Sequence, residues 1–281
     1  MNINNIIKEI EKVDPEVYER MDNRRSAMKS FANIGGKIAL AAVPLALGSM
    51  FQKAYAGTTG TMDTVVDILN YALTLEYLEA EFYAKGVAAS GLIPAGDTLT
   101  GLQLIAKHEA QHVAFLKTAI GAAGGTPVQS PAFDFTAKGT FNDVFSSFET
   151  FLNVAQTFED TGVRAYKGRA AEIVGGGDYL TAALRIHSVE ARHAAHIRGL
   201  RKAYGSGIGN VKPWITGKMS GINSTAVQAS YDGEDLTVQA KTINIVNING
   251  FSISADAASE AFDEPLSKEQ VLAIVGPFIK P

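Results

Sequence analysis

A glutamate followed three residues later by a histidine occurs twice in this chain, and this pattern constrains the fold more than any other feature. The first copy is Glu109 and His112, and the second is Glu190 and His193. Residues three apart on an α-helix lie on one face, so the carboxylate and the imidazole can both reach one cation. Two such pairs, completed by one glutamate from each of two further helices, would enclose two metal ions within a four-helix bundle.

The hydrophobic pattern predicts four helices, at about residues 61–88, 97–123, 141–174 and 178–204. Short turns rich in glycine and proline separate the first helix from the second and the third from the fourth, and we expect Asp97 and Asp178 to cap the helices that follow. The connection over residues 126–140 is long. Four helices predict an all-α fold. The long connection indicates two antiparallel hairpins joined by a crossover, because an up-down-up-down bundle needs only short loops.

The spacing also selects which glutamates belong to the site, because residues equidistant from a hairpin turn lie at the same height. Glu76 and Glu109 are centred on the first turn, and Glu159 and Glu190 are centred on the edge of the second, whereas Glu149 would place the centre inside a helix. The predicted metal ligands are therefore Glu76, Glu109, His112, Glu159, Glu190 and His193.

Two tyrosines extend this repeat, since Tyr83 and Tyr166 each follow a single glutamate by seven residues. If they lie near the metals, they could relay an electron or donate a hydrogen bond; the other interpretation is that they are ordinary core residues. All five histidines of the chain fall in or beside the two Glu-x-x-His segments, which favours metal binding.

The residues flanking these ligands leave several alternatives open. Glu79 is either an additional ligand or an outer neighbour of the site, and His108 is either an outer neighbour or a surface residue. His187 and His196 flank the second pair, and His196 would replace His193 only if the helix were distorted. We expect Glu81 to be solvated.

The segment from Ala72 to Tyr83, together with the two Glu-x-x-His helices, resembles the bacterial ferritin-like domain family that includes desiccation-related proteins. It is more distantly similar to rubrerythrins and bacterioferritins. The resemblance covers about residues 61–204, and it implies a ferritin-like four-helix bundle in which the six residues named above hold two ions of iron or manganese. The chain has no cysteine, so no cysteine-ligated iron domain accompanies the bundle.

Residues 1–56 are predicted to be an export signal. Arg24 and Arg25 precede an apolar run over residues 38–51, and residues 54–56, Ala-Tyr-Ala, provide a small-residue cleavage site. This order resembles a twin-arginine signal, and the alternatives are a weak membrane anchor or the general secretory route. We therefore expect the twin-arginine export machinery as a partner, and a periplasmic or cell-envelope location for the bundle over residues 57–204 and its extension.

The C-terminal extension over residues 205–281 changes in character. A β-rich stretch over 236–248 leads to Asn249 and Gly250 and predicts a hairpin or an extended segment, and a capping box of Ser267 and Gln270 predicts a short helix ending at Gly276. We expect this extension to pack on the bundle or on a neighbouring subunit and to carry no chemistry. The sequence alone does not explain residues 261–265.

Two functions follow from these features. The first is a di-metal oxidoreductase acting on O₂, peroxide or Fe²⁺, with ferroxidase, peroxidase and catalase-like reactions as alternatives. The second is a non-catalytic metal-binding envelope protein with a structural role or a role in protection against stress or desiccation. A bundle that loads zinc adventitiously is a third interpretation. A homodimer is one expected assembly. The net charge of −4 and the scarcity of clustered basic residues argue against nucleic acid as a partner.

Overall fold

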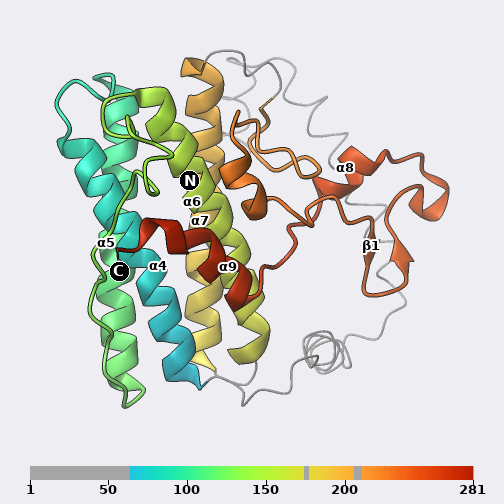
Figure 1. The fold of residues 1–281 in the computed structure, drawn as a ribbon. Helices are drawn as coiled ribbons and strands as arrows, with labels where there is room; N and C mark the ends of the chain where they lie inside the picture. Colours follow the sequence, from blue (N-terminus) through green and yellow to red (C-terminus); the bar gives the residue numbers. More distant parts are fainter. Residues whose placement is uncertain (1–63, 174–176, 206–210, 281) are drawn as a thin grey trace, which may run out of the picture. The chain divides into compact units, whose positions relative to one another are not determined.

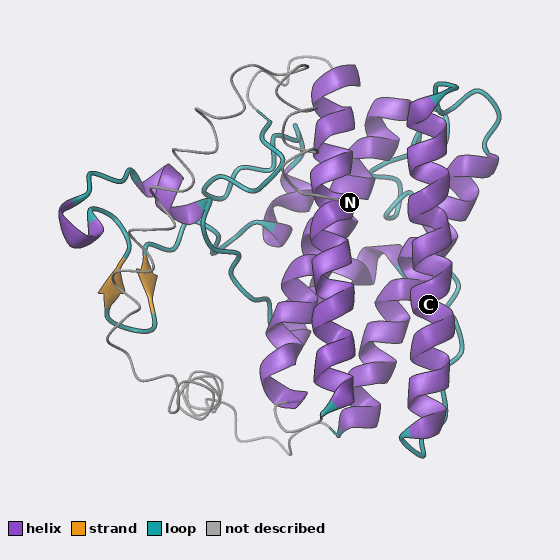
Figure 2. Ribbon diagram, turned by 180° about the vertical axis from the view of Figure 1, so that it is seen from behind, coloured by secondary structure: helices purple, strands orange, loops and turns teal. Residues whose placement is uncertain are grey.

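The computed structural model describes residues 64–173, 177–205 and 211–280, and these form a helical bundle with a C-terminal extension (Figure 1). Its long helices are α4 (Val65–Ala88), α5 (Asp97–Ala122), α6 (Phe148–Ala170) and α7 (Asp178–Tyr204). Helix α4 packs along α5, and α6 packs along α7. Figure 2 shows the same four helices side by side from behind. The predicted all-α fold with two hairpins and a crossover is confirmed.

The N-terminal ends of the four helices use two kinds of cap. Thr64 and Asp67 form a capping box on α4, whereas Gly96 and Gly177 precede α5 and α7 at φ angles of 91° and 56°. The prediction that Asp97 and Asp178 are N-caps is wrong, because each is the first residue of its helix. Glycine adopts these positive φ angles readily because it has no Cβ, whereas an aspartate at the same position would be strained. Each aspartate still places a negative charge at the positive end of its helix.

The crossover between α5 and α6 occupies residues 123–147 and is packed, because Phe133, Phe135 and Val144 are buried in the core. The prediction that the third helix begins near residue 141 is wrong. Asp134 accepts hydrogen bonds from the backbone of Thr136 and Lys138 and so holds the residues that follow it in a turn, and Ser147 then caps α6.

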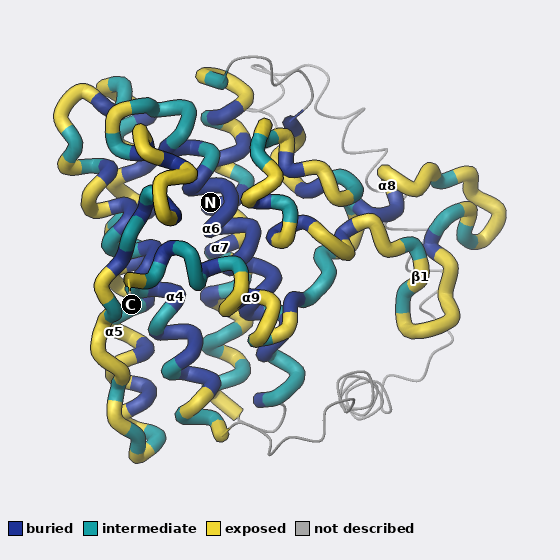
Figure 3. The backbone as a smooth tube through the Cα atoms, viewed as in Figure 1, coloured by how far each residue is buried: buried dark blue, intermediate teal, exposed yellow. Residues whose placement is uncertain are grey.

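The extension contains only short elements among its described residues. These are η2 (Thr225–Ser230), β1 (Val238–Gln239), β2 (Ile243–Asn244), η3 (Ile248–Gly250), α8 (Ala255–Ser259), α9 (Lys268–Val275) and η4 (Gly276–Phe278). The predicted capping box on α9 and its end at Gly276 are confirmed. The hairpin turns at residues 240–242, where Ala240 and Lys241 have positive φ, and not at Asn249 and Gly250. Figure 3 shows that the arm carrying β1 is largely exposed.

Three buried arginines of α6 and α7 attach the extension to the bundle. Arg164 donates to the backbone carbonyl groups of Ser230, Asp232 and Glu264 and pairs with the carboxylate of Glu234 at 2.7 Å. Because a buried guanidinium needs several acceptors, these carbonyl groups fix the path of the extension over α6.

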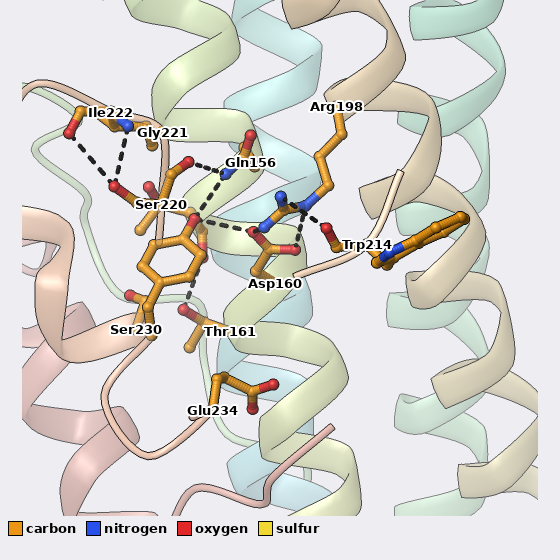
Figure 4. Close-up of polar contacts among 12 residues, drawn as sticks. Gln156, Asp160, Thr161, Arg198, Trp214, Ser220, Gly221, Ile222, Ser230 and Glu234 are labelled. Carbon is orange, nitrogen blue, oxygen red and sulfur yellow. Dashed lines mark hydrogen bonds and ion pairs between the residues drawn. The ribbon is translucent and has the colours of Figure 1, made fainter. Parts of the chain in front are cut away.

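Of the other two arginines, Arg198 lies in the network drawn in Figure 4, and Arg201 contacts that network through Gly221. Arg198 pairs with Asp160 and donates to the carbonyl of Trp214, and Arg201 donates to the carbonyl of Gly221. Asp160 also accepts a hydrogen bond of 2.9 Å from the hydroxyl of Tyr231, which is fully buried. The extension therefore covers the outer face of α6 through polar contacts as well as apolar ones.

No helix in the described ranges combines the length and the apolar character needed to cross a membrane. The predicted signal over residues 1–56 lies outside the described residues.

Candidate metal centre

The six side chains predicted as metal ligands converge in the interior of the bundle. Glu76 comes from α4, Glu109 and His112 from α5, Glu159 from α6, and Glu190 and His193 from α7, and all six are buried. Their ligand atoms form two groups, each with all atoms within 4.8 Å of one another. One group contains Glu76 and His112, the other contains Glu159 and His193, and both contain Glu109 and Glu190. The cluster thus offers two adjacent positions that share two carboxylates.

Unpartnered buried atoms indicate that these residues could hold metal ions. One oxygen each of Glu109 and Glu159, both oxygens of Glu190, and Nδ1 of His193 have no hydrogen-bond partner among the described residues. Nδ1 of His193 lies only 2.7 Å from Oε1 of Glu109, but the direction of approach does not make a hydrogen bond. Buried carboxylates without partners are costly, and hard divalent cations satisfy such oxygen-rich sets.

The pKa values of the metal-free cluster show how it accommodates so many carboxylates. Burial raises the pKa of Glu76 and of Glu159, and burial together with the charge of Glu109 raises the pKa of Glu190 to about 8. Burial also opposes the charged form of His112, but the adjacent carboxylates of Glu109, Glu190 and Glu76 outweigh it and raise the pKa of His112 to about 12. Protons therefore occupy the cluster wherever cations do not.

Glu109 and His193 are the members most strongly held in their charged forms. Burial alone would raise the pKa of Glu109, but contacts with His112 and His193 lower it to about 2. Burial alone would lower the pKa of His193, but the carboxylates of Glu109 and Glu159 raise it to about 10. The central carboxylate is thus ionised over the ordinary pH range, as a shared metal ligand must be.

The two tyrosines of the repeat hold the two unshared glutamates in a crosswise arrangement. Tyr83 of α4 donates to Oε1 of Glu159 of α6 at 2.5 Å, and Tyr166 of α6 donates to Oε1 of Glu76 of α4. Burial raises the pKa of both hydroxyl groups, so they remain protonated donors. Each bond leaves the second carboxylate oxygen facing a histidine, since Oε2 of Glu76 lies 3.1 Å from His112 and Oε2 of Glu159 lies 3.5 Å from His193. An electron-relay role for either tyrosine stays a prediction.

Glu79 lies beside the cluster without joining either group of ligand atoms. It is buried, and burial together with the charge of Glu190 raises its pKa well above the usual range. A Cβ at Gly162 would lie 3.3 Å from Oε1 of Glu79 and 3.4 Å from Oε2 of Glu190. Sequence reasoning missed Gly162, although the repeat aligns it with Glu79 and so shows that the two halves differ at this position.

The remaining histidines lie outside the two groups. His108 is half-buried and forms a hydrogen bond with His193, and His187 forms one with the carbonyl of Val163. His196 is exposed and lies against Gly101, so the alternative in which it replaces His193 is wrong for this structure. Glu81 pairs with Lys85 at the surface.

Comparison with known proteins returned one result for this region. A family model described as a ferritin-like domain matches residues 64–203, which span the four helices and all six clustered side chains. No curated protein and no solved structure matches the chain.

Proposed function

Residues 64–203 belong to the ferritin-like domain family. We propose that they hold two ions of iron or manganese and act as an oxidoreductase whose substrate is O₂, peroxide or Fe²⁺. The observation that carries this proposal is the pair of overlapping ligand groups that share Glu109 and Glu190. Two shared carboxylates would keep two metals adjacent, and one histidine on each side leaves room for a small substrate. Bound iron or manganese would supply the redox chemistry between metal and oxidant.

The protein's own residues would bind the metals, orient the carboxylates and hold protons when no metal is bound. Glu76 and Glu159 would each hold one metal, and the tyrosine hydroxyl on each keeps the free oxygen directed at the cluster. Glu190 holds a proton in the metal-free fold and would release it on loading, so metal uptake should liberate protons. The surrounding apolar side chains limit the access of water.

A cavity of about 20 Å³ supports a small oxidant. Its lining is almost entirely apolar and includes Ala72, Leu116, Ala165 and the ring of Tyr166, whose hydroxyl is bonded to Glu76. This volume holds about one small molecule. A small neutral molecule such as O₂ fits this cavity, which adjoins Tyr166 and not the six ligand side chains themselves.

The test is metal content followed by turnover, using protein purified from the compartment to which it is exported. We expect two iron or manganese ions per chain in the native protein and none in the Glu109→Gln, Glu190→Gln double variant. O₂ release from peroxide would identify catalase-like chemistry, and O₂-dependent oxidation of Fe²⁺ would identify a ferroxidase. A native protein with fewer than two metals per chain would refute the proposal.

A non-catalytic protective role is the second candidate, and the extension favours it. Three buried arginines attach the extension to the bundle, and the arm around β1 exposes Val238, Ile243 and Phe251. A large addition of this kind suits contacts with other molecules more than redox chemistry. Two bound metals with neither turnover reaction would support this role, such as protection against stress or desiccation.

Export by the twin-arginine machinery to the periplasm or cell envelope is part of the same proposal. It rests on Arg24, Arg25 and the cleavage segment over residues 54–56. Replacing both arginines by lysine should leave the protein in the cytoplasm, as measured by cell fractionation. Undiminished export of that variant would contradict the twin-arginine route.

A further inference from the structure

The two halves of the metal centre carry the same ligands but differ at the residue that precedes each Glu-x-x-His pair. His108 precedes Glu109 on α5, whereas Val189 precedes Glu190 on α7. The ligands and tyrosines of the two halves repeat in type, so this substitution breaks the internal symmetry of the site. One half therefore has an additional hydrogen-bonding group where the other has an apolar side chain.

His108 contacts the metal-binding histidine of the opposite helix in the plane of its ring. Nδ1 of His108 lies 3.0 Å from Nε2 of His193. The ring centroids are 5.2 Å apart and the ring planes are inclined by only 14°. The distance between the centroids exceeds the distance between the nitrogens by about the width of one ring, so the two nitrogens lie between the centroids. Since the planes are also nearly parallel, the rings meet edge to edge and are not stacked face to face. This is the arrangement in which the N–H of one ring is directed at the lone pair of the other.

The contact fixes which nitrogen of His193 faces the carboxylates. Nδ1 lies on the side of Glu109 and Glu159, and Nε2 lies on the side of His108. A histidine that binds a cation through Nδ1 carries its hydrogen on Nε2. His193 can therefore donate that hydrogen to His108 while Nδ1 remains available to the metal.

His112 has no such support. Its Nδ1 lies 3.1–3.2 Å from Glu76, Glu109 and Glu190, but no hydrogen bond joins its Nε2 to any residue in the described ranges. The position that the repeat relates to His108 is Val189, whose side chain has no hydrogen-bonding atom. The two histidines thus differ in the partner of the nitrogen that faces away from the metals.

We propose that His108 is a positioning residue that makes the Glu159–His193 position bind its metal more tightly than the Glu76–His112 position does. The inference rests on the proposed function, because it assumes that the cluster binds two metals. A hydrogen bond to the outer nitrogen of a metal-binding histidine fixes the ring and increases its basicity, and its loss typically costs about 10–100-fold in metal affinity. The two positions should therefore fill in sequence.

The test is a titration of the metal-free full-length protein with Co²⁺, followed by calorimetry and by visible absorption. We expect two binding steps, with the first tighter by about 10–100-fold. Glu159→Gln should remove the tighter step, and Glu76→Gln should remove the weaker one. Two equal binding constants, or the reverse assignment of the steps, would overturn the inference.

Matched substitutions at the symmetry-breaking position separate positioning from general damage. His108→Val, which copies Val189, should weaken the first step by about 10–100-fold and leave the second unchanged, so that the two constants converge. His108→Asn retains an acceptor near Nδ1 and should restore most of the difference, and Val189→His should tighten the second step. Unchanged constants in His108→Val, equal weakening of both steps, or no rescue by asparagine would each overturn the inference. Fewer than two Co²⁺ per wild-type chain would instead refute the proposed di-metal function itself.

Discussion

Replacing Glu190 by glutamine should stabilise the metal-free protein at alkaline pH and leave it unchanged at acidic pH. Burial and the charge of Glu109 raise the pKa of Glu190 to about 8, whereas the unfolded chain releases this proton near pH 4.5. Between these values the folded protein binds the proton and the unfolded chain does not. The corresponding stability is fully present below about pH 4.5 and is lost as the pH rises to about 8.

The magnitude follows from this interval. Each pH unit within it lowers the free energy of unfolding by up to about 1.4 kcal/mol, so the full loss is at most about 5 kcal/mol. Neighbouring carboxylates share protons with Glu190, which reduces the effect of one substitution to about 2–5 kcal/mol. Glutamine resembles the protonated carboxyl in size but cannot ionise, so the variant avoids this loss.

Urea unfolding of the chelator-treated proteins at pH 4.5 and pH 8, followed by circular dichroism, measures the effect. Glu81→Gln is the matched control, because Glu81 forms an exposed pair with Lys85 at 2.7 Å and should change stability by less than about 1 kcal/mol at either pH. An advantage of Glu190→Gln that is equal at both pH values, or that is larger at pH 4.5, would refute the reasoning.

Three further predictions follow from the same contacts. Metal should raise the melting temperature more at pH 8 than at pH 5, because it replaces the protons that the cluster loses, and calorimetry against chelated protein measures this. Tyr83→Phe and Tyr166→Phe should each cost about 1–3 kcal/mol in urea unfolding, because each leaves a buried glutamate oxygen unpaired; a loss in only one would contradict the crosswise arrangement. Arg164→Met should cost about 3–5 kcal/mol by the same assay, and adding Glu234→Gln should recover most of it; a neutral single variant would show that the ion pair does not hold the extension.

The residues of the metal cluster could be predicted because their arrangement follows from local helix geometry. Spacing by three residues places Glu109 with His112 on one face, and equal distance from a turn pairs Glu76 with Glu109 across a hairpin. Neither rule requires knowledge of distant contacts. The structure brings all six predicted side chains together, and metal binding by them stays a prediction.

The errors lie where non-local packing determines the backbone. The segment over residues 141–147 has helical periodicity in its sequence, but Phe141 and Val144 are buried in turns of the crossover. The β-rich stretch forms a hairpin of only two residues per strand, because the segment has few neighbours to pack against. The role of residues 261–265 was not predictable either, since the carbonyl of Glu264 accepts from Arg164, which is 100 residues away.

The buried polar residues of α6 could not be predicted from a simple hydrophobic pattern. Every residue from Val154 to Tyr166 is buried, whereas α7 buries only one face. Glu159 contributes to the metal cluster, and its neighbours Asp160 and Arg164 contribute to the ion pairs beneath the extension. A helix enclosed on all sides would ordinarily be apolar throughout. In α6 the polar side chains are tolerated because each side of the helix provides partners for them, so the metal centre and the extension both depend on this one element.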